Sequence, residues 1–138
     1  MFDRTLFIMV SCSLERTRSH IFEQVVANLL ECNKRTEFLD KLILFDNAST
    51  EVGTLDAMKN FPVVVQSDKN VGYWSALDWT LSNYQRFFTN DFDYLYIIES
   101  DLLHFNMHKL STAEDFLSTY TDVGSVRTNK FSVPFRAF

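Results

Sequence analysis

Residues 42–65, LILFDNASTEVGTLDAMKNFPVVV, carry the pattern that decides the fold. Two short apolar runs, 42–45 and 63–65, are typical of strands that are buried on both faces in a parallel sheet. Pro62 precedes the second run, at a position where a missing N–H is tolerated. Between the runs, residues 51–60 place apolar side chains on one side of a short helix. The stretch therefore predicts a strand, a helix and a second strand.

Polar residues mark the start of that short helix. Ser49 or Thr50 is expected to cap it, since a hydroxyl can accept from the free N–H groups of a first helical turn. Glu51 would then occupy the first turn, where the helix dipole favours an acid.

The same alternation runs through the rest of the chain. Further strands are predicted at 6–10 and 94–98, with a weak fifth strand at 123–127. Apolar residues at helical spacing predict helices around 21–30, 74–88 and 110–120. We therefore expect one α/β domain over residues 1–138, Rossmann-like, with a mainly parallel sheet and helices on both faces. The sheet is expected to stop after the fifth strand.

Each of the first four predicted strands ends in polar residues, and ligands of such sheets bind at the carboxyl ends of the strands. These ends read Ser11-Cys12-Ser13, Asp46-Asn47-Ala48-Ser49, Asp68-Lys69-Asn70-Val71-Gly72 and Glu99-Ser100-Asp101.

Composition excludes several classes of function. No phosphate-binding G-x-x-x-x-G-K-[ST] or dinucleotide-binding G-x-G-x-x-G motif is present. The formal net charge of −5, without a run of Lys or Arg, argues against nucleic acid as a partner. Two cysteines do not make a disulfide framework. No apolar run is long enough to span a membrane, so we expect a cytoplasmic protein that can sit at a membrane surface through a partner.

Three strand-end motifs together resemble family 2 glycosyltransferases, which have the GT-A fold. A D-N-x-S motif is found at 46–49, N-x-G-x-x-x-A at 70–76, and a D-x-D-like acidic motif at 99–101. The likeness spans about residues 5–127. It implies a domain that binds a nucleotide diphosphate sugar of the UDP or GDP type and transfers the sugar to an acceptor hydroxyl on a glycan, lipid or protein.

The acidic motif carries the sharpest expectation. Side chains at i and i+2 of an extended segment point the same way, so Glu99 and Asp101 can converge on one Mn²⁺ or Mg²⁺ ion. The resemblance implies that Asp101 is the direct metal ligand. Glu99 would contact the ribose, or the metal through water. The alternative is a solvated acidic turn. His104 and His108 are candidates for a further ligand, although surface positions suit them better.

The other motifs imply contacts to the nucleotide. Asp46 would accept from the ring N–H of a uracil-type base, or would instead form a turn that caps the following helix. The remaining candidates are Ser11 and Ser13 beneath the base or ribose, Asn47 beside Asp46, Asn70 and Gly72 along the nucleotide, and Ala76 as a small residue that leaves it room. Among nearby aromatic residues, Tyr73 and Trp79 could stack on a sugar, whereas Trp74 fits the core stripe.

A general base is missing from the expected site. Inverting glycosyltransferases need a carboxylate that deprotonates the acceptor, and residues 128–138 contain none. The catalytic residue therefore stays unknown. Three interpretations remain: a fragment of a longer enzyme, an enzyme that borrows a base or acceptor surface, or a non-catalytic nucleotide-sugar-binding module. A flavodoxin-like domain is a more remote alternative.

Overall fold

The computed structural model describes residues 2–101 and 105–126, in two compact units, Met1–Phe105 and Asn106–Phe138. His104, Arg127 and the tail that follows it lie outside the described residues. Within the described residues, every strand belongs to the first unit.

The first unit is built on a parallel sheet of four strands, β1 (Thr5–Ser11), β2 (Leu42–Asn47), β3 (Val63–Ser67) and β4 (Tyr94–Glu99). Their order is β3-β2-β1-β4. β1 therefore pairs with β2 on one side and with β4 on the other, and all pairs are parallel. The prediction of a parallel α/β sheet is confirmed. The order differs from the flavodoxin-like order, in which β1 lies between β2 and β3.

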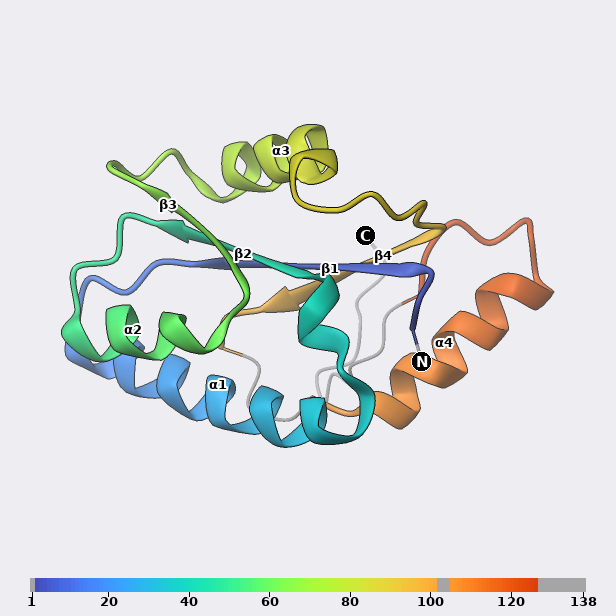
Figure 1. Cartoon of the computed structure of the whole chain (residues 1–138), viewed down its shortest axis with the longest axis horizontal. Coiled ribbons are helices and arrows are strands. Elements are labelled where there is room, and N and C mark those ends of the chain that lie inside the picture. The colour runs from blue at the N-terminus through green and yellow to red at the C-terminus, as the bar shows by residue number, and fades with distance from the viewer. Residues whose placement is uncertain (1, 102–104, 127–138) are drawn as a thin grey trace, which may run out of the picture. The chain divides into compact units, whose positions relative to one another are not determined.

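Helices cover both faces of this sheet, as the alternation predicted (Figure 1). α1 (Arg16–Thr36) and α2 (Val52–Ala57) lie on one face. α3 (Tyr73–Asn83) lies on the opposite face. Short 3-10 turns follow at Phe38–Lys41, Met58–Asn60 and Tyr84–Arg86.

The core is centred on β1 and β2, whose residues are all buried. One face is aromatic: Phe7 contacts Phe38, and Phe38 stacks on Phe105 with ring centroids 5.2 Å apart in both pairs. On the other face Leu77 of α3 packs with Ile8 and neighbouring aliphatic residues. The chain contains 14 phenylalanines, and several of them thus serve as core packing.

The buried face of α3 differs from the prediction at Trp74, which was expected in the core but is 76% exposed. The buried face of α3 instead contains Ala76, Leu77 and Thr80, with Tyr73 packed against the same clusters. These positions follow the i, i+3, i+4, i+7 spacing of one helix face. The face is hard to see in the sequence because two of its members are small or polar. The buried Thr80 hydroxyl is satisfied because it donates a hydrogen bond to the Ala76 carbonyl.

The start of α2 also differs from the prediction. Glu51 is the N-cap and makes no side-chain cap bond. Ser49 is occupied elsewhere, because its hydroxyl donates to Asp46 and accepts from the Ser13 N–H. Thr50 donates its backbone N–H to the Ser13 carbonyl. The residues expected to cap the helix therefore tie the ends of β1 and β2 together.

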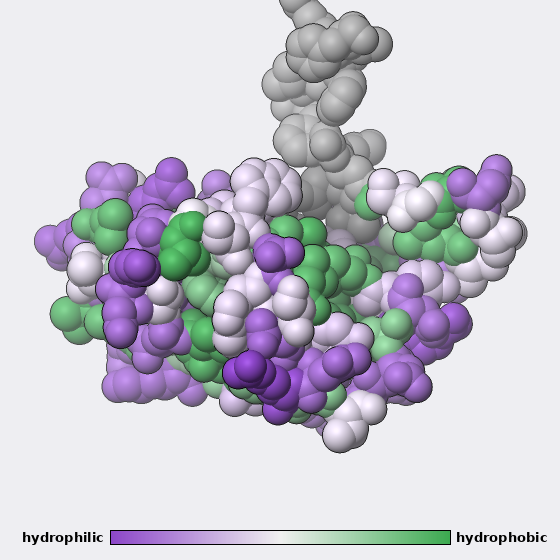
Figure 2. Space-filling model, turned by 90° about the horizontal axis from the view of Figure 1, so that it is seen from above, coloured by the Kyte–Doolittle hydropathy of each residue, from purple (hydrophilic) through white to green (hydrophobic). Residues whose placement is uncertain are grey.

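The edge strand β4 is only partly covered. Leu95 and Ile97 pair in register with Leu6 and Ile8, on the face where α3 packs, yet both remain exposed. The view onto that side of the molecule shows hydrophobic surface between the polar side chains (Figure 2).

The second unit contains α4 (Met107–Thr119), which matches the helix predicted around 110–120. The Asn106 side chain caps it by accepting from the His108 and Lys109 N–H groups at 2.9 and 3.3 Å. Residues 123–126 form no strand, so the predicted fifth strand is absent over this described part of its range. Of all the helices in the described ranges, none is long and apolar enough to cross a bilayer.

Candidate functional site

A pocket of about 340 Å³ opens at the carboxyl ends of β1 and β4. The chain runs outward from β1 to β2 and β3 on one side and to β4 on the other, so this is the topological switch point of the sheet. We call it the α3-side pocket. It is lined by Val10, Ser11, Cys12, Arg18, Asn47, Asn70, Gly72, Tyr73, Glu99, Ser100 and Asp101. Six of the nine residues predicted for the site are among them.

The acidic motif forms one wall of this pocket. Glu99 ends β4, and Asp101 follows two residues later; both are exposed. The Tyr73 hydroxyl at the start of α3 hydrogen-bonds to the Glu99 carboxylate. Burial raises the pKa of Tyr73, and the negative charge and hydrogen bond of Glu99 raise it further. A neutral Tyr73 hydroxyl therefore lies beside Glu99 at physiological pH.

Asp46 lies behind the pocket rather than in its wall. Its carboxylate is 1% exposed and accepts from the Ser11 hydroxyl at 2.9 Å. Ser49 donates to it through the backbone N–H at 3.1 Å and through the hydroxyl at 2.5 Å. Asp46 thus closes a turn with Ser49, and Ser11 is added across the strands, but Asp46 does not cap α2, whose N-cap is Glu51. The buried hydrogen bonds among Asp46, Ser11 and Ser49, which we call the clasp, hold the ends of β1 and β2 together.

Asn47 fixes the loop that leads into α3. Its side-chain oxygen accepts from the Val71 N–H at 2.8 Å. Asn70 accepts from the Gly72 N–H at 2.8 Å and donates to the Cys12 sulfur at 3.6 Å. Gly72 adopts φ 87° and ψ 156°, a conformation open essentially to glycine alone. The D-N-x-S and N-x-G-x-x-x-A motifs therefore form one hydrogen-bonded unit at the pocket.

Two other predicted residues are placed differently. Ala76 is fully buried against Val10 and Phe45, so its small size serves helix–sheet packing and it does not line the pocket. Ser13 is buried, and its carbonyl accepts from Thr50 and Glu51. Of the two candidate histidines, His104 lies outside the described residues and His108 belongs to α4 in the second unit.

Cys12 and Arg18 line the pocket but belong to none of the motifs found in the sequence. Burial raises the pKa of the Cys12 thiol, and Asp46 raises it further, while Arg18 and Asn70 oppose this. The sequence signal that could have indicated Arg18 is a basic residue in the first turn of the helix that follows β1. It was not recognised because no family motif covers it.

The carboxylates of Glu99 and Asp101 can hold a divalent cation only if further ligands complete its coordination. Within residues 2–101 and 105–126, no group of three His, Cys, Asp or Glu side chains is placed to hold a metal. Glu99 and Asp101 supply two carboxylates, and Mg²⁺ is commonly held by one or two carboxylates together with substrate phosphates. Ser100 and Asp101 form a turn after β4, so the alignment expected of an extended segment is not found. Two carboxylates fit only a cation that takes its remaining ligands from a bound molecule.

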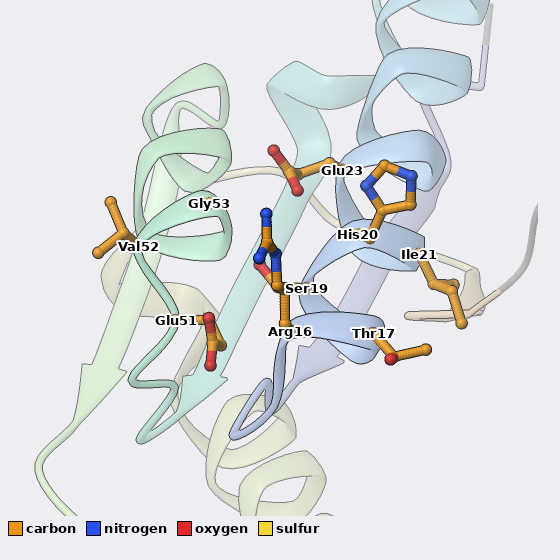
Figure 3. Close-up of a pocket in the computed structure, with 9 residues that line it drawn as sticks. All are labelled: Arg16, Thr17, Ser19, His20, Ile21, Glu23, Glu51, Val52 and Gly53. Carbon is orange, nitrogen blue, oxygen red and sulfur yellow. The ribbon is translucent and has the colours of Figure 1, made fainter.

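A separate groove of about 670 Å³ lies between α1 and α2 (Figure 3). Arg16 points into it, next to Glu51 and below Glu23, whereas Val52 points away. None of the predicted site residues lines this groove.

No protein-family model and no curated protein matches this chain. The function of the site is therefore inferred from its own geometry and chemistry.

Proposed function

We propose that this chain binds a nucleotide diphosphate sugar at the α3-side pocket, as the donor-binding part of a metal-dependent glycosyltransferase of GT-A type. One observation carries the proposal. The pocket at the switch point gathers residues of all three motifs, namely Asn47, Asn70, Gly72, Glu99 and Asp101. These residues are far apart in the sequence, and only the strand order brings them together.

The chemistry of the lining suits such a ligand. The amides of Asn47 and Asn70 and the hydroxyl of Tyr73 can hydrogen-bond a ribose, a base or a sugar. A Mn²⁺ or Mg²⁺ ion held by Asp101, with Glu99 beside it, would neutralise the diphosphate and stabilise the charge of the leaving group. In this proposal Asp46 supports the base-binding edge from behind, through Ser11 and Ser49.

Transfer also needs a base for the acceptor hydroxyl. The proposal uses both acids of the α3-side pocket around the metal, so neither is assigned as that base. This favours one specific alternative, a module that binds the donor without transferring the sugar. Turnover by the purified chain with a simple sugar acceptor separates the two functions.

The proposal is tested by calorimetry with UDP- and GDP-sugars in the presence of Mn²⁺. We expect saturable binding that Asp101→Asn weakens at least about tenfold, because the substitution removes a charged metal ligand. Asp91→Asn, in an exposed loop of the same unit, is the matched control and should bind as the wild type does. Absence of binding by every nucleotide sugar, or equal binding by Asp101→Asn, would refute the proposal.

A further inference from the structure

A second pocket, of about 240 Å³, adjoins the first on the side of α1. We call it the α1-side pocket. Its own lining includes Ser13, Glu15, Thr17, Ile21 and Phe22. Both pockets are also lined by Cys12, Arg18, Ser100 and Asp101. These four residues therefore form a common wall, and a single ligand can extend from one pocket to the other across it.

Arg18 stands out in this wall by its charge. Among the described residues that line either pocket it is the one basic side chain, whereas Glu15, Glu99 and Asp101 are acidic. The ion pairs found within the described ranges do not involve Arg18. Arg18 is an exposed residue, and its five N–H donors can serve a ligand. The chain has a net charge of −5. A positive Arg18 side chain in the wall shared by both pockets therefore favours the binding of an anionic ligand group beside it.

We propose that Arg18 binds the diphosphate of the ligand, which lies across the common wall with one end group in each pocket. This inference rests on the proposed function, which supplies the diphosphate. Asp101 would hold the divalent ion that accompanies the diphosphate, and the planar Arg18 guanidinium would bind two phosphate oxygens. Together they offset a charge that the acidic lining alone would repel.

Pocket size supports a ligand that spans both pockets. Ligand sites for whole small molecules are roughly 300–1,000 Å³. The α3-side pocket lies at the bottom of that range and the α1-side pocket lies below it. Each is suited to one end of a larger ligand, and the linking group must pass the wall that contains Arg18 and Asp101.

The chain offers a matched control in Arg16, two residues earlier in the same helix. Arg16 lines the groove between α1 and α2 and points into it (Figure 3), and it lines neither of the other two pockets. Arg16→Gln and Arg18→Gln therefore remove the same charge from the same turn of α1, but only the second removes it from the common wall.

The experiment measures the Kd of UDP, of GDP and of inorganic diphosphate, each with Mn²⁺, by calorimetry. Loss of a charge-assisted hydrogen bond predicts that Arg18→Gln raises the Kd of all diphosphates that bind by about 10- to 100-fold. Arg16→Gln should change it less than about twofold. Arg18→Lys, which keeps the charge without the fork, should recover part of the loss. Circular dichroism of each variant verifies the fold.

The outcomes separate this inference from the proposed function. Tight binding of UDP or GDP that Arg18→Gln leaves unchanged overturns the inference and leaves the proposed function standing. If inorganic diphosphate binds through Arg18 but no nucleotide sugar binds more tightly than it, the proposed function fails and the role of Arg18 stands. Equal losses in the two glutamine variants, or absence of binding by every diphosphate, also overturn the inference.

Discussion

At the scale of single residues, Asp46 has the most fully defined surroundings in the site. Its buried carboxylate accepts three hydrogen bonds from Ser11 and Ser49. The D-N-x-S motif identified the residue from the sequence, but the sequence left open whether the carboxylate faces a ligand or closes a turn. That choice depends on Ser11, which is 35 residues away in the chain. Only the pairing of β1 with β2 brings the two residues together.

Asp46→Ala is expected to destabilise the fold by about 2–4 kcal/mol, because it leaves three buried donors without their acceptor. Urea unfolding with an unchanged slope measures the loss. Asp78→Ala, on an exposed position of α3, is the control and should change the free energy of unfolding by less than about 0.5 kcal/mol. A loss at Asp46 no larger than at Asp78 would show that the clasp does not support the sheet.

Cys12 provides a chemical probe of the site, since it lines both pockets. Burial raises the pKa of both thiols, Cys12 and Cys32, so the reactive thiolate is a small fraction at a pH of about 7.5. We expect slow alkylation by iodoacetamide at that pH, with a rate that rises as the pH approaches and passes about 9. UDP or GDP with Mn²⁺ should protect Cys12 and leave Cys32 unprotected.

The alkylation experiment uses Cys12→Ser and Cys32→Ser so that each remaining thiol is followed alone by mass spectrometry. Fast alkylation of Cys12 near neutral pH would contradict the direction of its pKa shift. Equal protection of both cysteines would contradict the location of the ligand.

At the scale of elements, the loop from β3 to α3 depends on Gly72. Its positive φ is strained for any side chain, although the space around it is open. Gly72→Ala is therefore expected to cost about 1–3 kcal/mol through the backbone alone. Gly124→Ala is the matched control, with equally open space and no positive φ. It should be neutral or stabilise by up to about 1 kcal/mol. Thermal unfolding compares the two, and equal effects would rule out backbone strain as the cause.

The elements could be predicted from the sequence to very different degrees. The strands at 42–47 and 63–67 were recognised because short apolar runs bounded by polar residues are typical of buried parallel strands and too short for a helix. The buried face of α3 was misjudged at Trp74. In this helix Ala76 and Thr80 are buried, and hydropathy does not mark either of them as core.

At the scale of the whole molecule, the strand order could not be predicted from the sequence, because many orders share the same alternation of strands and helices. The order β3-β2-β1-β4 makes β1 central. It also decides which strand ends meet at the pocket. Because successive side chains of β2 point to opposite faces, Asn47 lines the pocket whereas the adjacent Asp46 lies behind it. Arg18 joins the site because α1 begins just after the central strand.

The central claim is that a diphosphate and a divalent ion bind together at the carboxyl ends of β1 and β4. The most direct measurement is Mn²⁺-induced broadening of amide NMR signals in the full chain, with and without saturating UDP or GDP. We expect broadening around Ser11–Ser13, Asn70–Tyr73 and Glu99–Asp101 that strengthens when the nucleotide is added. Broadening that is centred elsewhere, or that is the same with and without nucleotide, would contradict the account.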